Sequence, residues 1–426
     1  MSRTSGIVAL VGLLLGSPPV ARADVVQEWN AIMLATVSGQ NPFAQARFAA
    51  ITHVAVFEAV NATTGEYEPY LGTIAAPPWA SPDAAAVAAA HAVLVHYFSA
   101  HTGVLDAARD TSLAAIPDGQ PKTHGIAVGR AAAAAIIALR ENDGSGGSPV
   151  ADPFPPRSSS PGEWQLTPGC PAAGSGVFYH WRNVTPFALQ SSSHFRSGPP
   201  PALTSNKYAK DYKEVKAVGA LDSALRPADR AHVVAFYQAL LAVGVWNQVA
   251  RQLGAAHGSS LAENARAFAL INMALSDALV TVMETKYHYA FWRPETAIRA
   301  GDADGNPKTE PDIDFSPFMS SLPGPLGITP CFPGYPSAHA TASYAARRVV
   351  QEVWGAAGHS IDLIALIPPS EILTLYYTSL KQITDDIDDA RVYGGIHFRF
   401  DQEAGARQGW RIGGYVHGTL LRPVQF

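Results

Sequence analysis

The 426-residue sequence has few charged residues of either sign and only two cysteines. Charged side chains make up 15% of the chain, and 30 basic against 35 acidic residues leave a formal net charge of −5. Proteins that hold nucleic acid through its phosphates need a strongly basic surface, so this class of partner is excluded. Two cysteines are also too few for a disulfide framework or a cysteine-rich zinc or iron–sulfur site.

Long uncharged apolar runs are missing as well, and the one apolar stretch near the N-terminus is short. Residues 1–23 carry Arg3, an apolar stretch at Ile7–Leu15 and the small-x-small sequence Ala21-Arg22-Ala23, which is typical of a cleaved export signal. The stretch is shorter than the roughly 18–20 residues that cross a bilayer. We therefore predict a secreted or periplasmic protein that does not engage a membrane.

The rest of the chain is dominated by apolar residues at helical spacing. Hydrophobic residues make up 47% of the sequence, enough for a large core, and alternating patterns of convincing length for strands are absent. The prediction is an all-α fold of two antiparallel helical bundles packed together, with a long irregular Gly/Pro-rich loop. The predicted helices cover residues 29–37, 44–60, 82–98, 126–139, 228–245, 261–289, 337–354, 370–387 and 400–421.

The predicted loop covers residues 142–205, which are rich in Gly, Pro and Ser and show no sustained period. Its aromatic residues, Trp164 and Trp181 among them, indicate that it covers the protein body, because linkers are rarely so aromatic. We predict a signal peptide over 1–23, an N-terminal helical half with this covering loop over 24–205, and a C-terminal catalytic bundle over 206–426.

Three short segments concentrate polar groups in this apolar sequence. In the first, Lys286 and Arg293 are seven residues apart, so two helical turns would project both cations from one face. Pro294 disfavours the α conformation at Arg293, so we expect the helix to fray or end there. The aromatic residues between the two cations argue against a freely solvated pair.

The other two segments each end on a histidine. Pro336-Ser337-Ala338-His339 precedes an apolar run, so Ser337 is placed as an N-cap with unpaired backbone amides beyond it. Arg391 and His397 flank Gly394-Gly395, a pair that can bend the chain so that the two side chains converge. Simple capping and a core histidine at a glycine boundary are the ordinary alternatives.

Together these segments supply three cations, one hydroxyl, helix-end amides and two histidines. Clustered cations repel one another unless an anion lies between them. Guanidinium and ammonium groups, together with the amides of a helix N-terminus, bind compact tetrahedral oxyanions well. The pattern therefore predicts an oxyanion site.

The order and spacing of these motifs resemble a known superfamily. Lys-x6-Arg-Pro, Pro-Ser-x-His and Arg-x5-His are similar to the motifs of vanadium-dependent haloperoxidases and type 2 phosphatidic acid phosphatases. The flanking sequences Phe291-Trp292-Arg293-Pro294 and His397-Phe398-Arg399-Phe400-Asp401 resemble the haloperoxidase branch in particular, as do residues 57–61 and 181–187. The resemblance touches most of the chain beyond the predicted signal peptide.

The resemblance implies a role for each motif residue. His397 would bind vanadium, while the cations of Lys286, Arg293 and Arg391 neutralise the vanadate oxygens. The Ser337 hydroxyl and the Ala338 backbone amide would donate hydrogen bonds to the same oxyanion. His339 would act as the acid–base group, and Lys286, His339 and His397 form the expected catalytic set. The substrates would be hydrogen peroxide and a halide, with a small organic acceptor as a further option, and a homodimer is expected by analogy only.

Two departures from the family pattern bear on these roles. Ala338 stands where the best-known members have glycine, which adds a methyl group to the pocket and makes a positive φ costly. No carboxylate partner for His339 is evident: Asp277 and Asp229 are candidates, and Asp401 is expected to pair an arginine instead. Phe332 stands where chloride-oxidising relatives tend to have Phe, which hints at activity on chloride.

The sequence leaves two other functions open, and it leaves open whether the two cysteines form a disulfide. An exported acid phosphatase would use the same cradle, since phosphate replaces vanadate almost isosterically, with His397 as nucleophile and His339 as acid. An inactive anion-binding protein is a third option. Cys170 and Cys331 can be bonded in an oxidising compartment or remain free thiols.

Overall fold

The computed structural model describes residues 24–150, 152–171, 175–368 and 370–424, so the predicted signal peptide lies outside it. Within these residues the chain forms thirteen α-helices and one two-stranded antiparallel sheet, which confirms the predicted all-α class. The helices are α1 (Val25–Val37), α2 (Pro42–Thr64), α3 (Pro82–Tyr97), α4 (Thr102–Ala114), α5 (Gln120–Arg140), α6 (Asn206–Val218), α7 (Ala228–Ala239), α8 (Ala242–His257), α9 (Leu261–Tyr289), α10 (Pro294–Arg299), α11 (Ala338–Trp354), α12 (Leu380–Tyr393) and α13 (Arg399–Thr419). The strands are β1 (Ala357–Ile367) and β2 (Glu371–Ser379).

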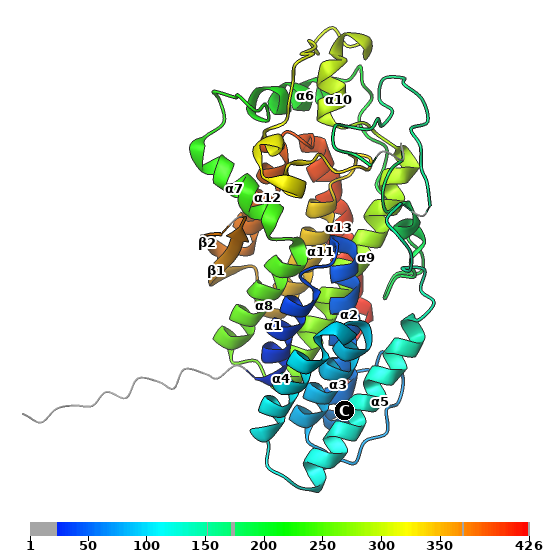
Figure 1. Ribbon diagram of the computed structural model, residues 1–426, viewed down its shortest axis with the longest axis vertical. Helices are drawn as coiled ribbons and strands as arrows, with labels where there is room; N and C mark the ends of the chain where they lie inside the picture. The colour runs from blue at the N-terminus through cyan, green and yellow to red at the C-terminus, as the bar shows by residue number, and fades with distance from the viewer. Residues whose placement is uncertain (1–23, 151, 172–174, 369, 425–426) are drawn as a thin grey trace, which may run out of the picture.

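The molecule is elongated, with α1 to α5 gathered towards one end and α6 and α10 at the other (Figure 1). The long helix α9 runs through the middle and packs against α2 on one side and α11 on the other. One continuous apolar core includes residues from all of these central helices. The predicted boundary at residues 205 and 206 falls just before α6 and stays a prediction.

Helix α9 is apolar around its whole circumference, which suits a helix at the centre of a large core. It begins with a capping box in which Ser260 and Glu263 each accept a hydrogen bond from the other's backbone amide. By length and hydropathy α9 could cross a membrane, and two bent helix pairs, α3 with α4 and α7 with α8, would qualify if each were joined. The apolar stretch of α9 is entirely buried inside the protein, so here it forms the core.

Helices α11 and α13 approach each other closely because α13 presents glycines at every fourth position. A Cβ atom on Gly405, Gly409 or Gly413 would collide with the α11 backbone at Ser337, Thr341 or Ala345, respectively. A hydrogen bond from the Ser337 amide to the Asp401 carbonyl, 3.0 Å long, joins the two helices at their N-terminal ends. This contact places the Pro-Ser-x-His segment beside the segment that contains His397.

The strands β1 and β2 form a hairpin that the sequence prediction missed. The helix predicted over residues 370–387 is wrong in its first half, because 371–379 is strand and α12 begins only at Leu380. In β1, buried Leu363 and Ala365 alternate with exposed Ile364 and Leu366. Because the exposed face is also apolar, the alternation is invisible in a hydropathy pattern.

The helix prediction also needs correction at one break and at three helices that it missed. The helix predicted over residues 228–245 is broken at Leu240 and Leu241, where α7 and α8 meet at 94°. Both residues have extended backbone conformations, so the chain leaves the helix there despite its continuous apolar pattern. Helices α4, α6 and α10 were not predicted, because α4 and α6 are partly exposed and polar and α10 is only six residues long.

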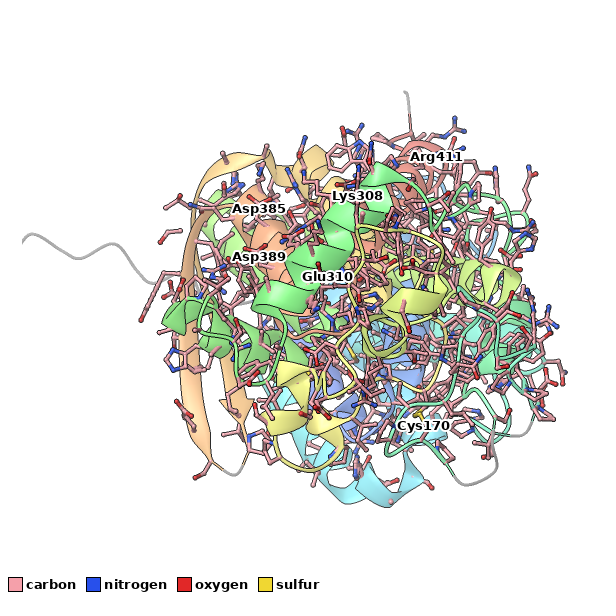
Figure 2. All side chains as sticks on the ribbon, turned by 90° about the horizontal axis from the view of Figure 1, so that it is seen from above. Cys170, Lys308, Glu310, Asp385, Asp389 and Arg411 are labelled. Carbon is pink, nitrogen blue, oxygen red and sulfur yellow. A yellow bond between two sulfur atoms is a disulfide. The ribbon has the colours of Figure 1, made fainter. Side chains whose placement is uncertain are left out.

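The segment 142–205 is largely irregular apart from a short 3₁₀ helix at Tyr179–Asn183, as predicted. Its aromatic residues Trp164, Trp181 and Phe187 are buried against the body, so we call it the covering loop. The loop and the hairpin lie on opposite sides of the molecule, and Cys170 is on the loop side (Figures 1 and 2). A disulfide joins Cys170 to Cys331, which resolves the bonding state that the sequence left open.

Candidate active site

The residues singled out in the sequence come from three places that the fold brings together. Lys286 lies in the last turn of α9 and Arg293 just beyond it, Ser337 to His339 form the start of α11, and Arg391 and His397 flank the junction between α12 and α13. The side chains of Lys286, Arg293, Ser337, Arg391 and His397 are 0–3% exposed. His339, Arg391 and His397 line one cavity of about 190 Å³.

Lys286 and Arg293 do not share one helix face, so this part of the prediction is wrong. Helix α9 ends at Tyr289, and Ala290 adopts a left-handed conformation with φ of 48°. Arg293 then has an extended backbone (ψ 158°) before Pro294, as the proline requires, and precedes the short helix α10. The chain reversal at Ala290 brings the two cations to the same site.

Backbone carbonyl groups hold both of these cations. The Lys286 ammonium donates to the carbonyls of Pro333 and Gly334 at 2.9 and 2.6 Å. The Arg293 Nε donates to the carbonyl of Phe332 at 3.0 Å. Both charges also lie over the Phe332 ring, 5.3 and 5.2 Å from its centroid, an arrangement that favours cations.

The start of α11 has the geometry that an N-cap serine predicts. The Ser337 hydroxyl accepts a hydrogen bond from the Ala340 amide at 3.3 Å, so its own proton is left to donate elsewhere. Ala338 is the first helical residue and is not among the described residues with positive φ. Replacing a family glycine by alanine therefore causes no backbone strain, and its methyl group lines the cavity wall.

His339 reaches the cavity without a carboxylate partner in the described part of the chain. Asp277, one expected candidate, accepts the amides of Phe187, Ala188 and Leu189 instead. Asp229, the other, pairs with Arg230. The Nε2 atom of His339 is buried and makes no hydrogen bond with any described residue, so it is free for a ligand.

Arg391 and His397 converge as the glycine pair between them predicts. Gly395 has φ of 77°, a conformation open to glycine, and a Cβ there would collide with the Gly219 carbonyl. The Arg391 Nη1 donates to the Gln238 side chain at 2.8 Å. Gln238 also lines the cavity, and sequence reasoning missed it because nothing in the α7 pattern marks it.

Asp401 fixes the tautomer of His397. The Nδ1 atom lies 2.8 Å from the Asp401 carboxylate, which also accepts the Phe398 amide at 3.1 Å. The other ring nitrogen, Nε2, accepts a hydrogen bond from Nη1 of Arg293 at 3.1 Å. The expectation that Asp401 pairs with an arginine is therefore wrong. The carboxylate instead keeps Nε2 unprotonated, so that a metal could replace the Arg293 N–H as its partner.

Burial of so many charges shifts the pKa of every ionisable group in the site. Burial lowers the pKa of Lys286 well below its usual range, and Arg293 and Arg391 lower it further, while Asp401 raises it. Burial also lowers the pKa of Arg293 to about 10 and that of Arg391 to about 9. These directions indicate a site with excess positive charge.

Burial and neighbouring charges also shift the pKa values of the two histidines and of Asp401. Burial, with the nearby cations, lowers the pKa values of His339 and His397 well below the usual range, so both rings are neutral. Burial raises the pKa of Asp401 to about 7 against the opposing effects of Lys286, the Phe398 amide and Arg293. A neutral His397 is the form that binds a metal.

Buried nitrogen atoms without hydrogen-bond partners among the described residues indicate what kind of ligand fits the site. Arg293 Nη2, Arg391 Nε and His339 Nε2 are buried and have no hydrogen-bond partner among the described residues. Leaving one buried donor unpaired costs about 1–3 kcal/mol. Unpaired groups on Arg391 and His339, which line the cavity, and on Arg293, which contacts His397, match an oxyanion of a metal or phosphorus. The residues therefore fit vanadate.

Binding of an oxyanion should be coupled to proton uptake. Burial and the neighbouring cations lower the pKa of Lys286, and a bound anion will raise it by favouring the charged form. At pH 8.5 orthophosphate is already a dianion, so we expect any proton uptake on binding to come from the protein's own groups. Affinity should then fall as pH rises further.

Titration calorimetry in two buffers of different ionisation enthalpy measures this proton uptake directly. The observed heat should differ between the buffers in the direction of proton uptake. Equal heats in both buffers, or net release of protons, would contradict the electrostatic account of the site.

Comparison with known proteins shows which families and structures this chain is similar to. Residues 266–425 match the family model described as the VCPO second helical-bundle domain. That region contains each residue of the three motifs. The resemblance drawn from the motifs is confirmed, and the chain has the helical fold of vanadium-dependent haloperoxidases.

Particular relatives are found by sequence and by structure. The chain is 27% identical over 204 residues to vanadium chloroperoxidase of Curvularia inaequalis, a match that covers 41% of this chain and 32% of that protein. The matched region thus spans about a third of the length of this curated relative. The crystal structure of the first bacterial vanadium-dependent iodoperoxidase superposes with a TM-score of 0.75 at 25% identity, covering 94% of this chain and 96% of that one.

A second solved structure shows the fold again. The holo-type bacterial vanadium-dependent chloroperoxidase superposes with a TM-score of 0.66 at 16% identity, covering 95% of this chain and 94% of that chain. The named relatives oxidise different halides according to their names. The comparisons therefore do not select a halide for this chain.

Proposed function

We propose that this protein is a vanadate-dependent haloperoxidase that uses hydrogen peroxide to oxidise a halide to hypohalous acid. The observation that carries the proposal is the group of buried nitrogen atoms without hydrogen-bond partners among the described residues, on Arg293, Arg391 and His339, around His397, whose Nδ1 is paired with Asp401. The similarity to vanadium chloroperoxidase and to the bacterial iodoperoxidase supports the same function.

Each residue of the site has a physical task in this proposal. His397 would hold the metal through Nε2, because Asp401 occupies Nδ1. Lys286, Arg293 and Arg391 would neutralise the negative oxygens through charge-assisted hydrogen bonds. When bound, vanadate supplies a Lewis acid that activates hydrogen peroxide towards attack by a halide.

The start of α11 would complete the cradle and handle protons. The Ser337 hydroxyl has a proton to donate, and the Ala338 amide lies at a helix N-terminus, where negative charge is favoured. His339 would give or take a proton at the oxygen that faces its free Nε2. Its pKa is low in the empty site and should rise when an anion enters, which brings it towards neutral pH.

The same cradle would accept phosphate, and with it phosphatase chemistry in which His397 attacks phosphorus. One experiment separates the two functions. Purified protein is assayed with and without orthovanadate for halide-dependent peroxide consumption and for aryl phosphate hydrolysis. We expect halogenating activity that requires vanadate and is suppressed by phosphate. Hydrolysis that vanadate inhibits, with no peroxide consumption, would establish the phosphatase instead, and neither activity would indicate an inactive anion-binding protein.

We also propose that the protein works outside the reducing cytoplasm, secreted or in a periplasm. The export-like residues 1–23 and the Cys170–Cys331 disulfide both support this location, since disulfides persist in oxidising compartments. Expression of the full chain followed by fractionation and mass measurement of the mature N-terminus tests it. Mature protein beginning at Asp24 is expected outside the cytoplasm, and an uncleaved cytoplasmic product would contradict the proposal.

A further inference from the structure

Residues 331–334 form an irregular segment whose main-chain carbonyl groups accept hydrogen bonds from two buried cations. The carbonyl of Phe332 accepts from Arg293, and the carbonyls of Pro333 and Gly334 accept from Lys286. Neither cation forms a salt bridge with a carboxylate in the described residues. The position of the Lys286 ammonium therefore depends on where this stretch of backbone lies, and so does that of Arg293 in part, since its Nη1 also donates to the Ile396 carbonyl at 3.1 Å.

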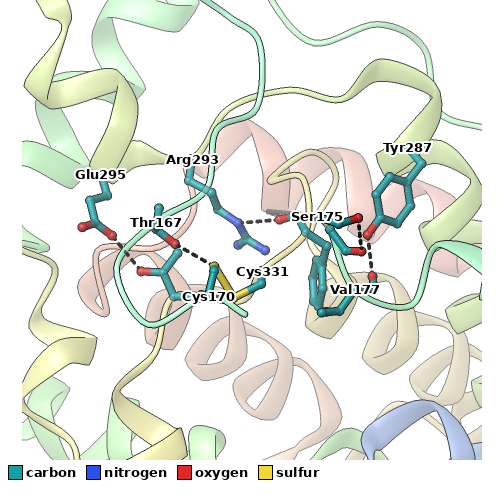
Figure 3. Close-up of a disulfide and its surroundings, with 11 residues drawn as sticks. Thr167, Cys170, Ser175, Val177, Tyr287, Arg293, Glu295 and Cys331 are labelled. Atoms are coloured by element: carbon teal, nitrogen blue, oxygen red, sulfur yellow. Dashed lines mark hydrogen bonds between the residues drawn. A yellow bond between two sulfur atoms is a disulfide. The ribbon is translucent and has the colours of Figure 1, made fainter. Parts of the chain in front are cut away.

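No helix or sheet holds this segment in place. Its two main-chain attachments to the rest of the protein are the hydrogen bonds from the Val177 amide to the Cys331 carbonyl and from the Gly334 amide to the Phe291 carbonyl, each 2.9 Å. The covalent attachment is the Cys170–Cys331 disulfide, immediately before the first carbonyl that holds a cation. Figure 3 shows the disulfide beside the Arg293 side chain and its hydrogen bond.

The covering loop that carries Cys170 is itself fixed to the end of α9. The Trp164 amide donates to the Ala290 carbonyl at 2.7 Å, and the Trp292 amide donates to the Gly162 carbonyl at 3.0 Å. The Tyr287 hydroxyl donates to the carbonyl of Val177. The covering loop is therefore hydrogen-bonded to the end of α9, which carries Lys286 and is followed by Arg293. The disulfide links the same loop to residues 331–334, whose carbonyls accept hydrogen bonds from these two cations.

We propose that the Cys170–Cys331 disulfide is a positioning device for the oxyanion site: it holds the carbonyls of residues 332–334 where they aim Lys286 and Arg293 at the bound anion. This inference rests on the proposed oxyanion cradle and adds a residue pair to it. With the bond opened, the segment keeps its two main-chain hydrogen bonds and the three that Lys286 and Arg293 donate to it, but it loses its covalent link to the covering loop. The cations then point at the anion for only part of the time, and affinity falls.

Orthophosphate is the probe for the test, because thiols and other reductants change the oxidation state of vanadate. Phosphate affinity is measured by titration calorimetry on wild-type protein and on the double variant Cys170→Ser/Cys331→Ser, together with the melting temperature of each. We expect phosphate to bind the double variant about tenfold more weakly, the size of effect that supporting residues around a site produce. Circular dichroism should show an unchanged helix content.

A control variant separates positioning from general loss of stability. Ile136, which is fully buried in α5 and is not among the residues that line the cavity, is replaced by alanine to lower the melting temperature without touching the site. Ile136→Ala should bind phosphate within twofold of wild type. If Cys170→Ser/Cys331→Ser also binds within twofold, the disulfide is merely structural and the proposal is wrong.

Two further outcomes keep this test decisive. If the double variant does not fold, the folded wild-type protein is treated with a water-soluble phosphine and titrated again, once thiol counting shows that the single disulfide has opened. The phosphine gains one oxygen from water as the disulfide becomes two thiols, and the same tenfold loss is expected. If untreated wild type binds no phosphate at all, the cradle itself is refuted, and this inference is overturned with it.

Discussion

His397→Ala should abolish vanadate binding, whereas His339→Ala should keep most of it. His397 lines the cavity and is kept unprotonated at Nε2 by Asp401 on Nδ1, so its loss removes the only metal ligand proposed among the described residues. His339 contributes one hydrogen bond and a proton, while the three cations and the Ser337 hydroxyl remain. Equilibrium dialysis against orthovanadate measures both affinities, and we expect a difference of at least about a hundredfold between the variants.

The two histidine variants should also differ in activity for different reasons. His397→Ala should be inactive because it is empty, and excess vanadate should not restore it. His339→Ala should hold vanadate and lose turnover, because the proton at the anion's oxygen has no acceptor or donor. If both variants retain vanadate equally, or if His339→Ala alone loses it, the assigned roles of the two rings are wrong.

Asp401→Asn is the second change expected to have a large effect. The carboxylate accepts the Nδ1 proton of His397 and so keeps Nε2 unprotonated. An asparagine oxygen can still accept that proton, but without the negative charge it makes the ring a weaker ligand, and its amide nitrogen can turn towards the ring instead. Partners of this kind contribute about 10–100-fold to metal affinity, so we expect vanadate to bind that much more weakly.

Asp277→Asn is the matched control for Asp401→Asn. Both carboxylates are completely buried, and burial raises the pKa of each, to about 6 for Asp277 and about 7 for Asp401. Asp277 accepts the three amides of residues 187–189 and has no contact with His397. Its substitution should lower stability and leave the vanadate affinity of the folded protein unchanged. Equal losses of affinity in both variants would show that His397 needs no oriented carboxylate.

The identity of the site residues could be predicted from the sequence because their chemistry is local. A serine before an apolar run, a proline after an arginine and a glycine pair before a histidine each constrain the backbone over only a few residues. The start of α11 and the bend between α12 and α13 therefore follow the prediction. Clustered cations in a chain with few charges already implied an anion.

Features that depend on tertiary contacts could not be predicted in this way. The chain reversal that brings Arg293 back towards Lys286 depends on a left-handed Ala290, and such a conformation has no sequence signal at a residue other than glycine. Asp401 lies four residues after His397, but only the start of α13 turns it towards the ring. Gln238 comes from a helix whose end at Ala239 was not predicted.

The hairpin and the disulfide also depend on tertiary packing. The hairpin escaped notice because β1 places apolar residues on both faces, and only the burial of one face in the folded protein tells them apart. The Cys170–Cys331 pair is separated by 161 residues, so its bonding depends on how the covering loop folds back on the body. Helix α9 resembles a membrane span in composition, and its burial between α2 and α11 makes it a core helix here.

The most direct test of the central claim is a crystal structure of the protein soaked with orthovanadate. We expect one tetrahedral or trigonal metal oxoanion per chain, with His397 Nε2 bonded to the metal and Lys286, Arg293 and Arg391 in contact with its oxygens. Vanadate bound elsewhere, or a hollow that stays empty at saturating vanadate while the fold is intact, would contradict the account.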